Sequence, residues 1–254
     1  MEENSLIEWT QNTFNPWIGC TKVSPGCLNC YAEKGDGYRH WTPQGWGKGK
    51  PRHRTSEEYW KAPLKWNRAA TESGDRAKVF CASLADVFDQ EVNPVWRTDL
   101  WNLIRQCPHL DWQLLTKRPQ DIAACLPDDW GRGWPNVWLG TSVENQELAD
   151  ERIPCLTAVP ARIHFLSVEP LLGPIEFQNL HGVEWIVVGG ESGGKARPMQ
   201  AVWVDQIKRQ CREQAIAFFF KQWGGPNKAK AGRTLNGRIF DEFPPLATST
   251  GNRS

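Results

Sequence analysis

Three cysteines near the start of the chain have the spacing that most directly indicates chemistry. Cys20, Cys27 and Cys30 follow the pattern C-x6-C-x2-C, and no second C-x2-C pair occurs. A structural zinc site takes four ligands, whereas this group offers three thiolates. A 4Fe-4S cluster held by three cysteines keeps one iron open to another molecule, and iron–sulfur clusters support radical chemistry. The triplet therefore predicts a 4Fe-4S site.

Two other interpretations of the triplet stay open. A zinc site forms if His40 or His53 supplies a fourth ligand, because Cys3His sites exist in proteins. A disulfide framework is not favoured, because a chain of 254 residues does not need one and the acidic, polar N-terminal residues do not resemble a secretory signal.

A second set of candidate residues is polar and follows short apolar runs. In an α/β barrel the carboxyl ends of the strands share one face, and the active site is built there. We therefore expect these side chains to line one polar site, although charged residues that simply mark the end of each strand are the alternative. The set consists of Ser83, Asp86, Lys117, Thr141, Ser142, Glu144, Ser167 and Glu169.

Residues 34–55, directly after the triplet, are rich in basic residues and glycine. The segment holds five glycines, six lysines or arginines and one acidic residue, with two tryptophans among them. Cations interleaved with aromatic rings suit the phosphates and bases of a nucleic acid. We expect a mobile lid whose Lys48, Lys50, Arg52 and Arg54 contact an anionic substrate. A solvated flexible loop is the alternative.

Short apolar runs alternate with helical patterns after residue 75, and these elements must position the candidate residues. Runs with little polar alternation are typical of buried parallel strands. Alternating strands and helices predict a parallel sheet of about seven strands, which favours an α/β fold of the partial or distorted (β/α) TIM-like barrel type with an N-terminal cysteine-rich loop. A doubly wound open sheet is the runner-up. The expected strands are residues 6–9, 78–83, 112–116, 137–141, 162–168, 185–188 and 217–220, and the expected helices are residues 94–107, 119–126, 144–156 and 202–214.

Composition limits the size and the surroundings of the protein. The 254 residues, of which 40% are hydrophobic, suit one barrel domain, which we place at residues 1–243 with a disordered tail at 244–254. The net charge of +1 predicts no global attraction to nucleic acid or to anionic membranes. The longest apolar run, residues 215–220, is too short to cross a bilayer. We expect a cytoplasmic protein without membrane contact, in which thiols stay reduced.

Several segments together resemble the phage Gp37/Gp68 family, a group with a domain of unknown function. The resemblance covers about residues 8–244 and is carried by NPWIGC before the triplet, YAE after it, and TKRP, VWLGTSVE, FLSVEPL, GGESG and FKQWGG further along. The family looks like an offshoot of the radical S-adenosylmethionine enzymes, whose three cysteines follow the first strand of a partial barrel. Their usual spacing is C-x3-C-x2-C, so the first gap is three residues longer here. Their Gly-Gly-Glu motif follows the second strand, whereas Glu191 follows the sixth, and we do not transfer the role of that motif to Glu191.

The resemblance implies a radical S-adenosylmethionine enzyme. Its 4Fe-4S cluster on the three cysteines delivers an electron to S-adenosylmethionine, and the 5′-deoxyadenosyl radical then takes a hydrogen atom from the substrate. The polar strand ends would bind S-adenosylmethionine, and an electron donor is an implied partner. The phage association suggests a nucleotide or DNA-base-linked substrate in phage DNA hypermodification, in the host cytoplasm. The alternatives are a zinc-stabilised, non-catalytic nucleic-acid-binding protein and a radical DNA-lesion lyase or repair enzyme.

Overall fold

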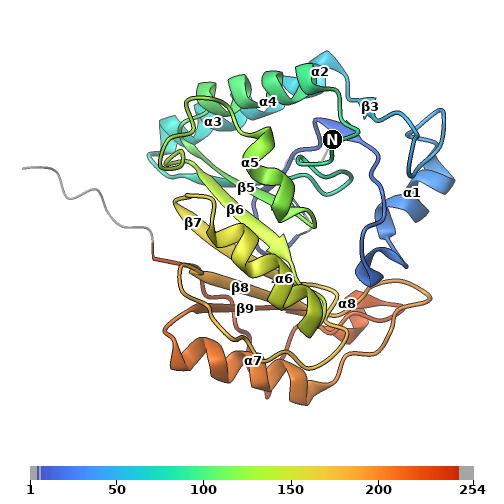
Figure 1. Cartoon of the computed structure of the whole chain (residues 1–254), viewed down its shortest axis with the longest axis vertical. Coiled ribbons are helices and arrows are strands. Elements are labelled where there is room, and N and C mark those ends of the chain that lie inside the picture. The colour runs from blue at the N-terminus through green and yellow to red at the C-terminus, as the bar shows by residue number, and fades with distance from the viewer. Residues whose placement is uncertain (1–4, 6, 246–254) are drawn as a thin grey trace, which may run out of the picture.

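A sheet of seven parallel strands forms the centre of the computed structural model, which describes residue 5 and residues 7–245 (Figure 1). Every neighbouring pair of strands is parallel, and the sheet curls into a half-barrel. The α/β partial-barrel prediction is therefore confirmed. In spatial order the strands are β1 (Asn12–Thr13), β4 (Ala77–Cys81), β5 (Leu110–Thr116), β6 (Val137–Ser142), β7 (Ile163–Val168), β8 (Trp185–Gly189) and β9 (Ala217–Gln222).

The first strand lies further along the chain than residues 6–9, where the apolar pattern placed it. Residue 6 is outside the described residues, and the strand that pairs with β4 is Asn12–Thr13. Trp9 instead packs inside the half-barrel, with its ring 4.6 Å from that of Phe80 between centroids. Ile7 packs against the same interior cluster. The apolar character of this segment thus reflects burial inside the barrel and not pairing with the sheet.

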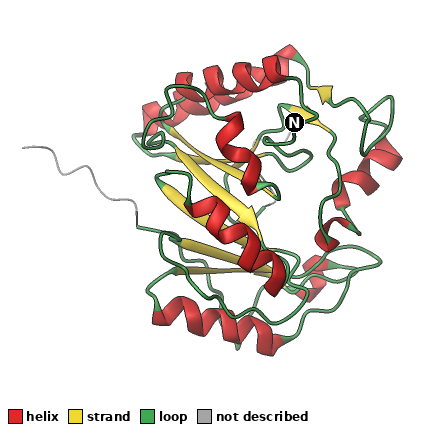
Figure 2. Ribbon diagram, in the orientation of Figure 1, coloured by secondary structure: helices red, strands yellow, loops and turns green. Residues whose placement is uncertain are grey.

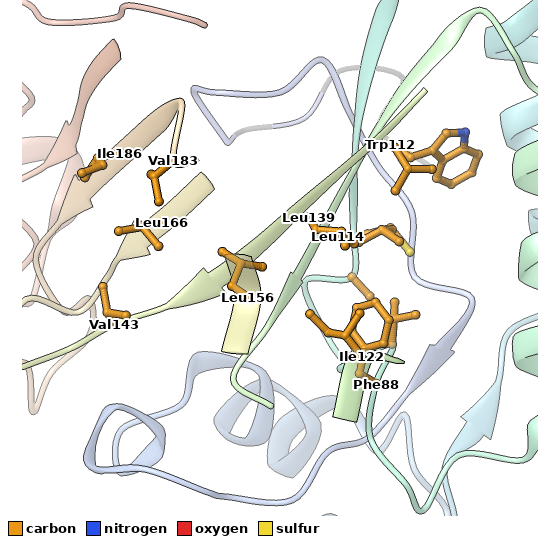
Figure 3. Packing of buried hydrophobic residues seen from close by; sticks show 14 of the residues in the cluster. Phe88, Trp112, Leu114, Ile122, Leu139, Val143, Leu156, Leu166, Val183 and Ile186 are labelled. Carbon is orange, nitrogen blue, oxygen red and sulfur yellow. The ribbon is translucent and has the colours of Figure 1, made fainter. Parts of the chain in front are cut away.

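Side chains alternate between the two faces of each strand, as the period of two requires. On the concave face lie Trp138, Phe165, Trp185 and Phe219, which form the interior aromatic cluster. The residues between them face the helices, and Figure 3 shows part of that packing, including Leu139, Leu166 and Ile186 from the strands and Leu156 from a covering helix. The half-barrel therefore has an aromatic floor on its inside and an aliphatic layer on its outside.

Helices cover the convex face of the sheet (Figure 2). The expected helices are found as α4 (Pro94–Gln106), the pair η2 (Pro119–Asp121) and α5 (Ile122–Cys125), α6 (Gln146–Thr157) and α7 (Ala201–Glu213). Asn93 caps α4 through its side-chain oxygen, which accepts from Val95 N, so the Asn-Pro start signal acts as expected. Four further α-helices were not expected from the sequence: α1 (Tyr31–Arg39), α2 (Glu57–Trp60), α3 (Ala62–Ser73) and α8 (Lys228–Ala231).

A small antiparallel ribbon carries the cysteine loop away from the sheet. The ribbon pairs β2 (Trp17–Ile18) with β3 (His53–Arg54). Between these two strands the chain forms the short helix η1 (Pro25–Cys27) and then α1 (Tyr31–Arg39). The cysteine loop is therefore anchored at both ends near the carboxyl edge of the sheet, where Gly19 also bridges to Ala85 beyond β4.

Candidate functional site

One cavity lies at the carboxyl ends of the strands and joins the cysteine loop to the sheet. It has a volume of about 480 Å³, and its lining includes Cys20, Cys27 and Cys30 together with residues from the ends of several strands. All three cysteines are free thiols. Three free thiols on the wall of one cavity are the donor set that a three-cysteine 4Fe-4S cluster requires, so the residues present fit that group.

Each thiol has its own surroundings in the loop. Cys27 ends η1, and its sulfur lies 3.7 Å from the hydroxyl of Ser24. Cys30 directly precedes α1, and Cys20 follows the ribbon strand β2. Burial and the carboxylate of Asp86 raise the pKa of Cys20 to about 12. An unliganded Cys20 is therefore protonated at neutral pH, and metal binding there has to release a proton.

Glu144 holds one side of the cysteine loop. Its side chain is fully buried, and Oε1 accepts from Ser24 Oγ at 2.8 Å and from Lys117 Nζ at 2.9 Å. Its Oε2 accepts from Arg152 Nη1 at 3.1 Å. Gly26 lies against the same carboxylate, so a Cβ at that position would collide with it. These contacts connect the long first gap of the triplet to the end of β6.

Glu191 holds the other side of the loop. It accepts from Asn29 Nδ2 at 3.0 Å, from Arg197 N at 2.8 Å and from the Arg197 guanidinium. Arg197 also donates to the carbonyl of Pro25 at 3.0 Å. Burial raises the pKa of Glu191, but the hydrogen bonds from Arg197 outweigh it and hold that pKa at about 2. The carboxylate is therefore charged near neutral pH and fixes the segment between Cys27 and Cys30.

Asp86 and Arg118 form a buried pair beside Cys20. Arg118 Nη1 lies 2.9 Å from Asp86 Oδ2 and 3.7 Å from Cys20 Sγ. Asp86 also accepts from Thr116 Oγ1 at 2.8 Å and from Phe88 N at 3.0 Å. The Asp86 carboxylate is thus engaged by donors of the protein itself.

The remaining strand-end candidates divide by the face of the strand on which they lie. Ser142 and Ser167 are partners in the register of β6 and β7, and both line the cavity. Both residues are almost fully buried, and neither hydroxyl has a hydrogen-bond partner among the described residues. Thr141 points to the opposite face, where its hydroxyl donates to the Thr116 carbonyl at 3.0 Å, and it does not line the cavity. The two serines are therefore the free hydroxyls of the cavity.

A second ion pair faces the cavity from the far strands. Lys221 Nζ lies 2.8 and 2.9 Å from the two oxygens of Glu169, and both residues line the cavity. Ser83, Asp86 and Lys117 also belong to the lining, whereas Glu144 does not. Six of the eight strand-end candidates therefore meet at one cavity, and Thr141 and Glu144 lie behind its wall.

Lys221, Glu191 and Arg118 were absent from the candidates chosen from sequence. All three lie at or just after the ends of apolar strands, in FKQWGG, GGESG and TKRP. A polar residue at the end of an apolar run is the same signal that identified Glu169. The sequence could therefore have identified these three residues as well.

The basic segment is more fixed than a mobile lid would be. Its first residues belong to α1, and Asp36 accepts from both the backbone and the hydroxyl of Thr42. Arg52 is buried and donates to Asp89 at 2.6 Å, so it is not available to a substrate. Arg54 lies 3.0 Å from Asp99 and stacks over the ring of Trp60. The substrate prediction thus does not hold for the side chain of Arg52.

Two lysines and one tryptophan of the segment remain placed for contact with a ligand. Lys48 and Lys50 are exposed, and Trp46 lines the cavity. Lys48 and Lys50 flank Gly49, whose amide donates to Glu91 Oε2 at 2.8 Å. The outer turn of the segment therefore presents exposed cations within four residues of a tryptophan in the cavity wall.

The described residues offer no preformed site for the zinc alternative. No three His, Cys, Asp or Glu side chains in this part of the chain gather closely enough to hold one metal ion. His40 and His53 are both exposed. In a 4Fe-4S cluster the cysteines bind different irons and so need not converge on one point. Separately, none of the helices in the described ranges is both long and apolar enough to cross a membrane.

The fold and the site define a parallel α/β half-barrel protein with a three-cysteine loop over the carboxyl ends of its strands. The chain belongs to the family described as "Protein of unknown function (DUF5131)", whose model matches residues 4–244. A family of unknown function was expected from the sequence, and that expectation is confirmed in this form, while the Gp37/Gp68 designation stays a hypothesis. No curated protein matches the chain significantly.

Solved structures of spore photoproduct lyase are similar to this chain at low identity. A variant with bound AdoMet and dinucleoside spore photoproduct shows 10% identity and a TM-score of 0.48, over 80% of this chain and 62% of that one. Spore photoproduct lyase complexed with the dinucleoside shows 9% identity and a TM-score of 0.45, over 78% and 59%. The chain thus spans less than two thirds of their length. At these values the likeness carries no argument about activity, and the fold is defined by the strand order itself.

Proposed function

We propose that this protein is a radical S-adenosylmethionine enzyme. The observation that supports this most strongly is the position of Cys20, Cys27 and Cys30 on the wall of a cavity at the carboxyl ends of parallel strands. Those ends are where an α/β barrel builds its active site. Three thiolates without a fourth suit a cluster with one open iron. Residues 1–243 would act as one domain, and of the predicted tail at 244–254, residues 246–254 lie outside the described residues.

The three cysteines would hold a 4Fe-4S cluster, which when bound supplies one electron to S-adenosylmethionine and so gives access to a 5′-deoxyadenosyl radical. The protein's share is to hold the loop and to exclude water. Glu144 and Glu191 fix the loop from two strand ends. The aromatic floor around Phe165 and Trp185 fills the inside of the half-barrel beneath the cavity and would exclude water from that side.

We infer that four of the lining residues contact S-adenosylmethionine. Ser142 and Ser167 present two neighbouring hydroxyls without protein partners, which suit the hydroxyls of a ribose. Ser83 and Glu169 line the same cavity, and an ammonium group would take the place that Lys221 occupies against the Glu169 carboxylate. Asp86, Lys117, Thr141 and Glu144 would support these residues through the contacts described above.

The proposed substrate is a nucleotide or a DNA-base-linked group, and the setting in phage DNA hypermodification follows from the family resemblance. Support comes from Lys48 and Lys50, which are exposed, and from Trp46 in the cavity wall. Cations bind phosphates, and an indole ring stacks on a base. An electron donor is the proposed partner.

Anaerobic reconstitution with iron and sulfide tests this function directly. We expect about four iron atoms per chain and a broad absorption band that reduction bleaches. The double variant Cys27→Ala Cys30→Ala should lose both, whereas Cys155→Ala, which removes a cysteine outside the cavity, should lose neither. A colourless protein that holds one zinc would instead favour the zinc-stabilised, nucleic-acid-binding alternative. Full iron loading in the double variant would refute the proposed ligands.

A further inference from the structure

The guanidinium of Arg118 contacts the sulfur of Cys20 and the loop around it. Nη1 lies 3.7 Å from Cys20 Sγ, and Nη2 donates to the Thr21 carbonyl at 2.6 Å. The side chain is almost fully buried, so water does not screen this contact. A planar fork of donors thus holds both the sulfur and the backbone of the next residue.

Asp86 holds the guanidinium in place from the other side. Its Oδ2 lies 2.9 Å from Arg118 Nη1, and Thr116 and backbone amides donate to the same carboxylate. Asp89, paired with Arg52, is the next acid, 3.9 Å from Arg118 Nη2. Burial lowers the pKa of Arg118, but Asp86 and its other neighbours raise it above the usual value. Arg118 is therefore a fixed positive charge.

We propose that Arg118 is a positioning residue that raises the reduction potential of the cluster through Cys20, and that Asp86 lowers it. The inference rests on the proposed function. Reduction adds one negative charge to the cluster. An N–H donor and a positive charge beside a ligating sulfur favour the reduced state, whereas a nearby carboxylate opposes it. The buried setting strengthens both effects.

Substitutions of Arg118 and Asp86 should therefore shift the reduction potential in opposite directions. Arg118→Met removes the charge and the donor, so the reduction potential should fall. Asp86→Asn removes the negative charge and keeps a side chain of the same shape, so the potential should rise. A purely structural role would move both variants in the same direction, because either change breaks the same ion pair.

The measurement is a redox titration of the reconstituted protein with dithionite and mediators, followed by electron paramagnetic resonance, with iron counted in each sample. Arg105→Met and Asp129→Asn break an exposed pair away from the cavity and should leave the potential unchanged. Arg118→Lys keeps the positive charge but loses the fork, so its potential should fall by less than that of Arg118→Met.

Equal potentials, or shifts of the same sign in Arg118→Met and Asp86→Asn, would overturn the inference. If either variant does not hold about four iron atoms, the test is the reduction potential of Arg118→Lys. A potential of Arg118→Lys equal to or above that of the parent overturns the inference. A parent protein that assembles no 4Fe-4S cluster refutes the proposed function and this inference together. A parent protein that does hold a 4Fe-4S cluster, but whose reduction potential is unchanged in the Arg118 and Asp86 variants, refutes the inference alone.

Discussion

Replacing Glu144 by alanine should destabilise the protein more than any single change on its surface. The carboxylate is fully buried and accepts from Ser24, Lys117 and Arg152. Arg152 is itself almost fully buried, so the substitution leaves an unpaired guanidinium in the interior. It also releases the loop between Cys20 and Cys27 from the end of β6.

The size of this effect follows from the partners. Removing one member of a buried ion pair costs about 3–5 kcal/mol. Arg152 keeps the Ser142 carbonyl at 2.8 Å, and Lys117 is partly exposed and can reach water, so the lower end of that range applies. Loss of the Ser24 hydrogen bond adds about 1 kcal/mol. The total of about 4 kcal/mol corresponds to a decrease in Tm of about 8–16 °C for a chain of this size.

Thermal unfolding followed by circular dichroism measures this decrease. Glu147→Ala, an exposed residue in the first turn of α6, is the matched control and should cost less than about 1 kcal/mol. Because the loop is loosened, reconstituted Glu144→Ala should also lose iron to a chelator faster than the parent. A Tm within about 3 °C of the parent would show that Glu144 does not anchor the loop.

Three further predictions concern the cavity and its rim. The double variant Ser142→Ala Ser167→Ala should weaken S-adenosylmethionine binding by about 1–3 kcal/mol, or about 5- to 150-fold in Kd by equilibrium dialysis, because two unpartnered hydroxyls are lost. The folded-state pKa of Glu191, about 2, lies below the ordinary 4.5. Its contribution to stability is therefore full above the ordinary pKa and is lost as pH falls towards 2, so the Tm difference between the parent and Glu191→Gln should shrink over that range. Lys48→Ala Lys50→Ala should reduce the salt dependence of binding to a single-stranded oligonucleotide by about 1.5 units of slope.

Each of these predictions has a matched control. Thr71→Val removes an exposed hydroxyl of α3, outside the cavity, and should leave S-adenosylmethionine binding unchanged; equal loss in both variants would contradict the assignment of the serines. A Tm difference between the parent and Glu191→Gln that does not change with pH would show that the charge of the Glu191 carboxylate does not stabilise the loop. Lys61→Ala and Lys65→Ala, exposed residues of the region around α3 that do not line the cavity, should not alter the salt slope. An unchanged slope in the Lys48 and Lys50 variant would exclude phosphate contacts there.

Much of the fold could be predicted from sequence because parallel strands are buried on both faces. Such strands appear as short apolar runs, and the runs at residues 137–141 and 217–220 correspond to β6 and to the edge strand β9 within two residues. The exception is instructive. Ile7 and Trp9 are as apolar as a strand, but they fill the interior of the half-barrel. Hydrophobicity alone does not distinguish these two kinds of burial.

The candidate site was predictable in its position and less so in its individual contacts. The carboxyl ends of parallel strands had to meet, so Ser142, Ser167 and Glu169 lie at one cavity. The alternation of side chains could have separated Ser142 from Thr141, since adjacent residues face opposite sides of a strand. The pairing of Arg52 with Asp89 joins residues 37 positions apart, and no local pattern predicts it.

The most direct test of the central proposal is cleavage of S-adenosylmethionine by the reconstituted protein. The protein is incubated anaerobically with S-adenosylmethionine and dithionite, and 5′-deoxyadenosine is quantified by chromatography. We expect 5′-deoxyadenosine from the parent protein and none from Cys20→Ala, Cys27→Ala or Cys30→Ala. A parent protein that carries a 4Fe-4S cluster but forms no 5′-deoxyadenosine above the level of these variants would contradict the assignment as a radical S-adenosylmethionine enzyme.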